Sequence, residues 1–349
     1  MIHRPLASLL QAIPLPAILI GPDERIIAAN QAAADLLGVG QGNGMVGRHF
    51  MTILRQPNML DGIEACLRDG ESHDSHYLGN DGANDTTFVT RCSGVETAQG
   101  AGVLVSFEDI SNLQQASQMR RDFVANVSHE LRSPLTALMG FIETLRGPAR
   151  DDKEAKDRFL NIMQDEAARM ERLVRDLLSL SRVEAQERVR PQTIVDLSEL
   201  VQSVIHTLTP QADEAQVTLI TSGTDAPLVV PGDPDQLRQV LTNLVENAIK
   251  YGEPEQSVEI SLATSQDDPL MLGPAAQLTV RDEGPGFEIV HISRLTERFY
   301  RVDNHRSREM GGTGLGLAIV KHILNRHRGR LRITSEVGKG SEFRVFLPF

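Results

Sequence analysis

The chain has 349 residues, of which 40% are hydrophobic and 23% charged, and its formal net charge is -12 at pH 7. The length exceeds what one hydrophobic core usually organises, and the composition is that of a folded protein rather than a disordered or fibrous one. The negative charge disfavours non-specific binding to nucleic acid or anionic lipid and favours protein or nucleotide partners.

Two cysteines, Cys66 and Cys92, are present, without the spacing of a metal site or the number needed for a disulfide framework. We expect both to be buried thiols in a reducing compartment, and we expect the chain to be cytoplasmic. The early apolar run from Ile13 to Ile20 contains two prolines and is too short for a membrane span or a signal peptide. A membrane anchor encoded upstream of the given start would lie outside this sequence.

Residues 1–110 mix short apolar runs with turn clusters and end in the strand-like segment Val103–Phe107, which predicts a small α+β domain. Residues 111–188 contain few glycines or prolines and predict two long helices joined by a turn around Gly147–Asp152. Residues 191–349 predict an α/β sandwich, with strands near Val258–Leu262, Gln277–Arg281, Leu331–Ser335 and Glu342–Leu347 and helices near Leu197–Leu208, Pro234–Lys250 and Leu317–Arg326.

Apolar residues recur along the two long helices at alternating spacings of three and four, as in a coiled-coil seam. These residues are Val124, Val127, Leu131, Pro134, Leu138, Leu145, Phe159, Ile162, Met170, Leu173, Leu177 and Leu180. One hairpin cannot bury a seam of this length, so we expect two copies to pair into a four-helix bundle, which makes the protein a homodimer.

The first long helix carries the string Phe123-Val-Ala-Asn-Val-Ser-His-Glu-Leu-Arg-Ser-Pro-Leu-Thr136. The seam places His129 on the outward face, where its imidazole can meet a second domain. Glu130 can accept a proton from one ring nitrogen and leave the other as a nucleophile, and Pro134 should bend the helix beside it. A surface histidine next to a glutamate is the plainer interpretation of these two residues alone.

Three further motifs predict a nucleotide site. Asn243 and Asn247 lie one turn apart on the predicted helix 234–250, where their amide oxygens suit Mg²⁺, and Lys250 follows within reach of a phosphate. Asp282-Glu-Gly-Pro-Gly-Phe287 follows a strand, and its carboxylate can accept a hydrogen bond from an exocyclic amine. Gly311-Gly-Thr-Gly-Leu-Gly-Leu317 leads into a helix whose first N–H groups can hold phosphates. No parallel βαβ unit precedes it, which excludes a Rossmann site.

The segment Phe287–Met310 lies between the two glycine motifs and predicts a mobile lid over a triphosphate. Its arginines can neutralise charge that develops during phosphoryl transfer. They are Arg294, Arg298, Arg301, Arg306 and Arg308.

The string around His129 resembles the phosphoacceptor box of bacterial two-component sensor histidine kinases. The later motifs look like the N, G1, F and G2 boxes of the ATP-binding domain that these kinases share with gyrase, Hsp90 and MutL. The resemblance implies a protein-histidine kinase that phosphorylates itself on His129 and passes the phosphoryl group to an aspartate of a response regulator. It also implies that Glu130 is the base. Ser133 occupies the position that serves regulator dephosphorylation in many members.

By the same resemblance, ATP and Mg²⁺ are the cofactors. Asp282 reads adenine, Asn247 binds Mg²⁺ with Asn243 near it, and Phe299 anchors the lid. The other expected nucleotide contacts are Lys250, Tyr251, Gly284, Gly286, Arg306, Arg308, Gly312, Thr313, Gly314, Leu315 and Gly316. Glu283 departs from the pattern, because family members often carry asparagine there.

Residues 1–110, with the run Leu19-Ile-Gly-Pro-Asp-Glu-Arg-Ile-Ile-Ala-Ala-Asn30, resemble a PAS domain. We expect an interaction or small-ligand module without a bound cofactor, with His49, His73 and His76 as surface histidines. The lid sequence looks most like that of phosphate-regulon sensor kinases. Association with membrane proteins through this domain is compatible with the resemblance.

Two other classes use some of the same motifs. An ATP-driven clamp of the gyrase or Hsp90 type needs no histidine on a dimer bundle, and a pseudokinase scaffold needs no intact nucleotide pocket. The sequence favours the kinase because it keeps both sets of residues. It does not show whether phosphorylation occurs within a protomer or across a dimer, and it does not identify the regulator or the signal.

Overall fold

The computed structural model describes residues 8–39, 44–80, 85–266, 271, 273–302 and 312–349. The chain divides into two compact units, Met1–Val124 and Ala125–Phe349, and each is described by itself. Among the described helices, none combines the length and the apolar character needed to cross a membrane.

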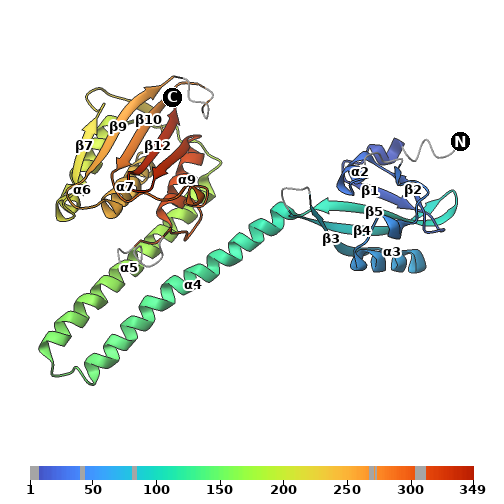
Figure 1. The fold of residues 1–349 in the computed structure, drawn as a ribbon, viewed down its shortest axis with the longest axis horizontal. Helices are drawn as coiled ribbons and strands as arrows, with labels where there is room; N and C mark the ends of the chain where they lie inside the picture. Colours follow the sequence, from blue (N-terminus) through green and yellow to red (C-terminus); the bar gives the residue numbers. More distant parts are fainter. Residues whose placement is uncertain (1–7, 40–43, 81–84, 267–270, 272, 303–311) are drawn as a thin grey trace. The chain divides into compact units, whose positions relative to one another are not determined.

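The first unit is built on a five-stranded antiparallel sheet in the order β2-β1-β5-β4-β3 (Figure 1). Its strands are β1 (Ala17–Ile20), β2 (Ile26–Ala29), β3 (His73–Asn80), β4 (Asp85–Thr97) and β5 (Gly100–Asp109). Helices α2 (Gln31–Leu36) and α3 (Pro57–Asp69) and the 3₁₀ turn η2 (Phe50–Thr52) connect β2 to β3. The observed mixture of strands and short helices confirms the predicted α+β domain.

The core of this unit holds both cysteines. Cys66 and Cys92 are buried as predicted, and burial raises the pKa of Cys92 to about 12. His49 and His73 pair with the carboxylates of Glu24 at 2.9 Å and Asp69 at 3.0 Å. These contacts are typical of surface histidines.

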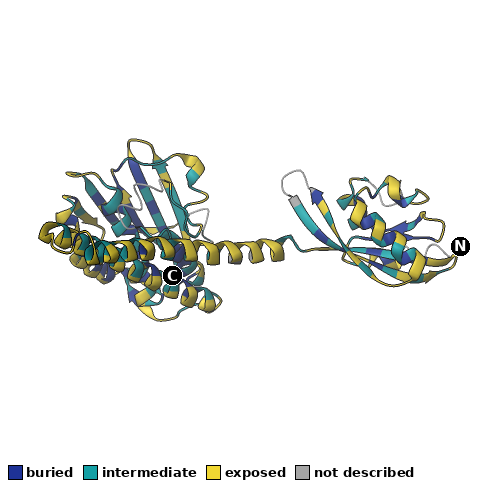
Figure 2. Cartoon of the chain, turned by 90° about the horizontal axis from the view of Figure 1, so that it is seen from below, coloured by how far each residue is buried: buried dark blue, intermediate teal, exposed yellow. Residues whose placement is uncertain are grey.

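The predicted hairpin consists of α4 (Ser111–Arg146) and α5 (Lys153–Gln186). The Asp152 side chain caps α5 by accepting a hydrogen bond from the Ala155 N–H at 2.9 Å. Much of the hairpin surface is exposed (Figure 2). The exposed residues include large apolar side chains at Leu135, Met139, Ile142, Leu160, Val174 and Leu178.

The rest of the second unit is a sandwich whose five-stranded sheet has the order β11-β12-β10-β9-β7. The strands are β7 (Thr218–Ser222), β9 (Ser257–Ser265), β10 (Ala275–Asp282), β11 (Arg330–Glu336) and β12 (Gly340–Pro348). Helices α6 (Leu197–Glu214), α7 (Pro234–Tyr251) and α9 (Gly316–Arg326) cover one face of the sheet (Figure 1). This arrangement confirms the predicted α/β sandwich.

Three strands of this region were not among the predicted elements. β6 (Ile194–Asp196) and β8 (Val229–Pro231) are three residues long and pair only with each other, and β7 is an exposed edge strand that pairs in parallel with β9. Such segments carry too few alternating residues for a strand pattern. Helix α6 also runs past Pro210 to Glu214, beyond the predicted end at Leu208, because Ala212 is buried against its neighbours.

Candidate functional site

The turn that carries the candidate phosphoacceptor lies in the middle of α4; it comprises residues 129–134 and is called the phosphoacceptor turn below. His129 is exposed, as the seam pattern predicts, while Glu130 and Leu131 are partly buried and Pro134 is buried within the unbroken helix. Ser133, one turn after His129, donates its hydroxyl hydrogen to the His129 carbonyl at 3.2 Å. The helix therefore presents the imidazole and the Ser133 hydroxyl on one exposed face.

Glu130 is held by two arginines from other parts of the fold. Arg169 of α5 lies 3.3 Å from its Oε2 atom, and Arg301, which follows η3 (Ile289–His291), lies 3.2 Å from the same oxygen. Arg301 is almost fully buried, with 5% of its side chain exposed. The carboxylate beside the candidate phosphoacceptor is thus tied to the segment after η3.

Helix α7 carries the candidate metal and phosphate residues. Asn243 and Asn247 are half-buried one turn apart, and the Asn243 amide donates to the Gly316 carbonyl at 3.2 Å, which joins α7 to the start of α9. Burial, together with the charges of Arg301, Arg172 and Arg169, lowers the pKa of Lys250 to about 8. The Lys250 ammonium also lies 5.0 Å from the centre of the Tyr251 ring. This cluster of cations suits an anionic ligand.

Asp282, at the end of β10, is buried with 5% exposure. Its Oδ1 atom accepts hydrogen bonds from the N–H groups of Gly284 at 3.0 Å and Ser341 at 3.1 Å. Burial nevertheless raises the pKa of this carboxyl group. A buried carboxylate with so little solvent is costly for folding, which is typical of a group that serves a ligand.

The loop after Asp282 requires its glycines. A Cβ on Gly284 would lie 2.5 Å from the Tyr251 carbonyl oxygen, and one on Gly286, whose φ is +62°, would lie 2.2 Å from the Glu336 carbonyl oxygen. Glu283, the departure from the family pattern, accepts hydrogen bonds from the Ser257 N–H and hydroxyl at 3.2 Å. It therefore fastens the loop to β9.

Gly312, Thr313, Gly314, Leu315 and Gly316 form the loop that enters α9, here called the phosphate loop. Leu315 is fully buried, and its N–H donates to the Thr313 hydroxyl at 3.3 Å. The Phe299 N–H donates to the Gly314 carbonyl at 2.8 Å, and a Cβ on Gly314 would lie 2.9 Å from the Phe299 Cα atom. Phe299 is thereby fixed against this loop. Arg306 and Arg308 lie outside the described residues.

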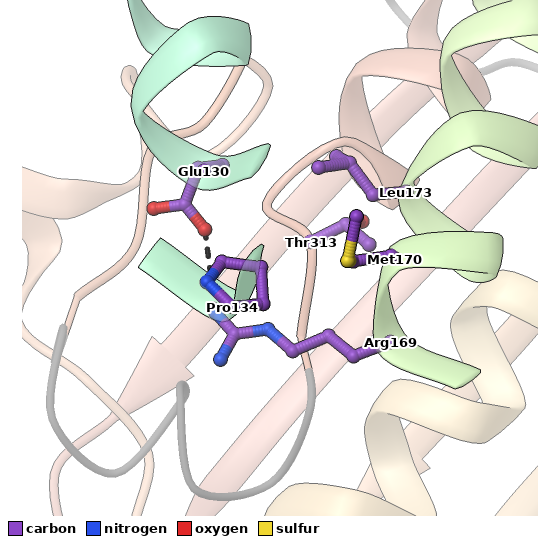
Figure 3. Close-up of a pocket in the computed structure, with 6 residues that line it drawn as sticks. All are labelled: Glu130, Pro134, Arg169, Met170, Leu173 and Thr313. Carbon is purple, nitrogen blue, oxygen red and sulfur yellow. Dashed lines mark hydrogen bonds and ion pairs between the residues drawn. The ribbon is translucent and has the colours of Figure 1, made fainter. Parts of the chain in front are cut away.

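Figure 3 shows a small pocket between these parts, lined by Glu130 and Pro134 of α4, by Arg169, Met170 and Leu173 of α5, and by Thr313 of the phosphate loop. The phosphoacceptor turn and the phosphate loop, about 180 residues apart in the sequence, thus share one pocket.

Several contacts of the site involve residues that the sequence analysis did not select. The Thr313 hydroxyl donates to Asp176 at 2.6 Å, Arg298 donates to Glu184 at 2.6 Å, and His322 lies 3.0 Å from Glu187. Asp176 and Glu184 of α5 and the C-cap residue Glu187 are spaced by eight and three residues, so they lie on one face of the helix. This spacing of acidic residues was the only sequence feature that could have indicated these contacts.

Family models match three consecutive regions. Residues 10–115 match the PAS fold, residues 119–186 match the His Kinase A (phospho-acceptor) domain, and residues 232–349 match the histidine kinase-, DNA gyrase B- and HSP90-like ATPase.

Curated relatives match over most of the chain. The sensor protein kinase WalK of Staphylococcus aureus is 33% identical over 328 residues, which cover 93% of this chain and 76% of that protein. The phosphate regulon sensor protein PhoR of Pseudomonas aeruginosa is 43% identical over 241 residues, which cover 69% of this chain and 52% of PhoR. The chain spans about half the length of PhoR and of WalK from Staphylococcus saprophyticus.

A crystal structure of the histidine kinase ThkA in complex with the response regulator protein TrrA has the same fold. Its TM-score is 0.52 and its sequence identity 24%, with 98% of this chain and 97% of that chain covered.

Proposed function

Because the chain belongs to the sensor histidine kinases of two-component systems, we propose that it transfers the γ-phosphoryl group of ATP to His129 and then to an aspartate of a response regulator. One observation carries this proposal. Glu130, the residue next to His129, and Thr313 of the phosphate loop line the same pocket, so the turn that carries the proposed phosphoacceptor lies beside the loop that would hold phosphates.

The nucleotide contacts follow from the chemistry of the pocket residues. Asp282 would accept the adenine amino hydrogen, the N–H groups at the start of α9 would hold phosphates, and Lys250 would neutralise phosphate charge. Gly284 and Gly286 would shape the adenine end by letting the loop after Asp282 pack against the backbone of Tyr251 and Glu336, where any Cβ would collide. Tyr251, Phe299, Gly312, Gly314, Leu315 and Gly316 complete the proposed set, with Arg306 and Arg308 from the segment before the loop.

Mg²⁺ would be held by the amide oxygens of Asn247 and Asn243. The donor set fits, because the Asn243 amide nitrogen already donates to Gly316 and its oxygen is the remaining polar atom. The ion would neutralise charge on the phosphates when it is bound.

In the transfer step, the imidazole of His129 attacks the γ-phosphorus, the P–N bond forms, and the bond to the β-phosphate oxygen breaks to release ADP. Glu130 accepts the imidazole N–H proton, and Arg169 and Arg301 hold its carboxylate in place. Arg301, which lies beside Glu130, can neutralise the negative charge on the γ-phosphoryl group.

We propose a homodimer held by the hairpin. The exposed apolar residues of α4 and α5 supply the surface that a second hairpin would cover, since single exposed leucines are ordinary but a row of them marks an interface.

The chain is proposed to contain three domains. They are a PAS-like domain at residues 1–110, the phosphoacceptor hairpin at residues 111–188 and the ATP-binding domain at residues 191–349.

The proposed partner is the receiver domain of a response regulator, the kind of partner that ThkA binds in its crystal structure. Ser133 is proposed to orient water for dephosphorylating that partner, since its hydroxyl oxygen can accept a hydrogen bond while its hydrogen is donated to the helix. The similarity to PhoR supports a role in phosphate signalling. Both ATP and receiver domains are found in the cytoplasm, which is the proposed location.

The experiment is to incubate the purified chain with γ-labelled ATP and Mg²⁺ and then to add a purified receiver domain. Label should appear on the chain first and then move to the receiver domain. ATP turnover without labelled protein would favour the clamp class. Absence of both nucleotide binding and labelling would favour the scaffold class.

A further inference from the structure

One face of α5 is docked against the sandwich. Besides the acidic contacts already described, the Ser179 hydroxyl donates to Gln239 of α7 at 2.8 Å, and Leu180 and Val183 are buried. Glu187 also accepts a hydrogen bond from Asn325 of α9 at 2.9 Å. The docked face therefore extends from Asp176 to Glu187, and its first residue lies at the phosphate loop.

At the Asp176 end of the docked face, the contact with the phosphate loop uses the single hydroxyl hydrogen of Thr313. Thr313 donates its hydrogen to Asp176 Oδ2 at 2.6 Å and accepts a hydrogen bond from the Leu315 N–H at 3.3 Å. A threonine hydroxyl has one donor. In this docked arrangement Thr313 cannot donate to a phosphate oxygen as well, and a phosphate near Thr313 would meet a carboxylate.

The groups around Asp176 would also oppose a phosphate at this position. Burial raises the pKa of Asp176, and the nearby Glu246 of α7 has a raised pKa for the same main reason, with the charge of Asp176 contributing. The charged groups that face the pair are Arg172 and Arg175 for Asp176, and Arg172 and Lys250 for Glu246. A triphosphate would bring further negative charge to two carboxylates that are already poorly solvated.

We propose that Asp176 competes with the phosphates of ATP for the phosphate loop, so that docking of the sandwich on α5 weakens nucleotide binding and ATP binding releases this end of α5. This inference rests on the proposed function, because it assumes that the phosphate loop binds ATP. ATP binding and docking of the sandwich on α5 are then thermodynamically linked. Docking lowers the ATP affinity by the same factor by which bound ATP lowers the equilibrium constant for docking.

The test is the affinity of the full chain for ATP and for adenosine, measured by calorimetry in the wild type and in Asp176→Asn. The variant keeps the shape of the side chain but loses its charge. We expect ATP to bind the variant roughly three- to tenfold more tightly, as the loss of a charge-assisted hydrogen bond implies. Adenosine, which has no phosphates, should bind both proteins equally. Asp157→Asn, at an exposed position near the start of α5, is the matched control and should not change either affinity.

Thr313 supplies a second comparison. In a Thr313→Val background the gain from Asp176→Asn should be smaller, because the shared hydrogen bond no longer exists, while Thr313→Ser should retain the gain. Equal ATP affinity in the wild type and Asp176→Asn, or an equal gain for adenosine, would overturn the inference. A wild type that binds no ATP would instead overturn the proposed function itself.

Discussion

Arg301 lies with its Nη2 atom 3.2 Å from Oε2 of Glu130, so the segment after η3 contacts the residue next to the candidate phosphoacceptor. The same arginine reaches the phosphate loop, because a Cβ on Gly314 would lie 3.3 Å from its Nε atom. Within the described part of the chain this buried Nε has no hydrogen-bond partner. Arg301 therefore links the phosphoacceptor turn to the proposed triphosphate site.

Replacing Glu130 with glutamine should lower the rate of autophosphorylation by about 100-fold, the lower end for loss of a general base. The affinity for ATP should stay the same, because Glu130 is not among the proposed nucleotide contacts and its replacement keeps the shape of the side chain. Labelling rates with γ-labelled ATP check this. Glu130→Asp should retain part of the rate, and Glu143→Gln, an exposed position on the same helix, should retain all of it. An unchanged rate in Glu130→Gln would remove Glu130 from the mechanism.

Asp282→Asn should weaken ATP binding without lowering the thermal stability of the protein. Burial raises the pKa of this carboxyl group in the folded state, so its contribution to stability is present at acidic pH and is lost as the pH rises through the folded pKa. Removing the charge should leave the thermal midpoint at pH 7.5 unchanged or higher, while ATP affinity falls by roughly tenfold or more. Calorimetric titration and thermal unfolding of the same samples check both parts. A lower midpoint with normal ATP binding would show that the carboxylate is structural.

ATP binding should be accompanied by proton uptake near pH 8. The pKa of Lys250 is lowered to about 8, so the ammonium group is only partly protonated there. Phosphate oxygens would raise this pKa, and ATP affinity should therefore fall as the pH rises above 8. Titrations in two buffers of different ionisation enthalpy measure the proton uptake. Lys250→Gln should abolish it, and Lys321→Gln, an exposed lysine on α9, should not.

Leu178→Glu should convert the proposed dimer to monomers. Leu178 is 55% exposed on α5, and burying the exposed half of this leucine in each of two copies contributes about 2–3 kcal/mol together. Sedimentation velocity over a range of concentrations measures the change. Val337→Glu, an exposed apolar position in the turn between β11 and β12, is the control. A wild type that sediments as a monomer at all concentrations would contradict the four-helix bundle.

The sequence predicted the hairpin and the sandwich well because their patterns are local. The alternation of Phe343, Val345 and Leu347 appears in β12, and the turn around Gly147–Asp152 separates α4 from α5. The short pair β6 and β8 and the edge strand β7 were missed, since their pairing depends on neighbours far along the chain.

Only part of the candidate site could be predicted from the sequence. Motif residues such as Asp282 and Thr313 could be selected because their spacing to glycines is local. The contacts Thr313 to Asp176 and Arg301 to Glu130 could not be predicted, because they depend on how the sandwich docks on α5 and α4. Helical periodicity identifies the faces of each helix but does not indicate which loop meets them.

The most direct measurement is the stability and the position of the label after incubation with γ-labelled ATP and Mg²⁺. Phosphohistidine survives alkali but not acid, so the wild-type label should be acid-labile and should disappear in His129→Gln. His206→Gln, an exposed histidine on α6, should label like the wild type. Label that resists acid, or that remains in His129→Gln, would contradict the assignment of His129 as the phosphoacceptor.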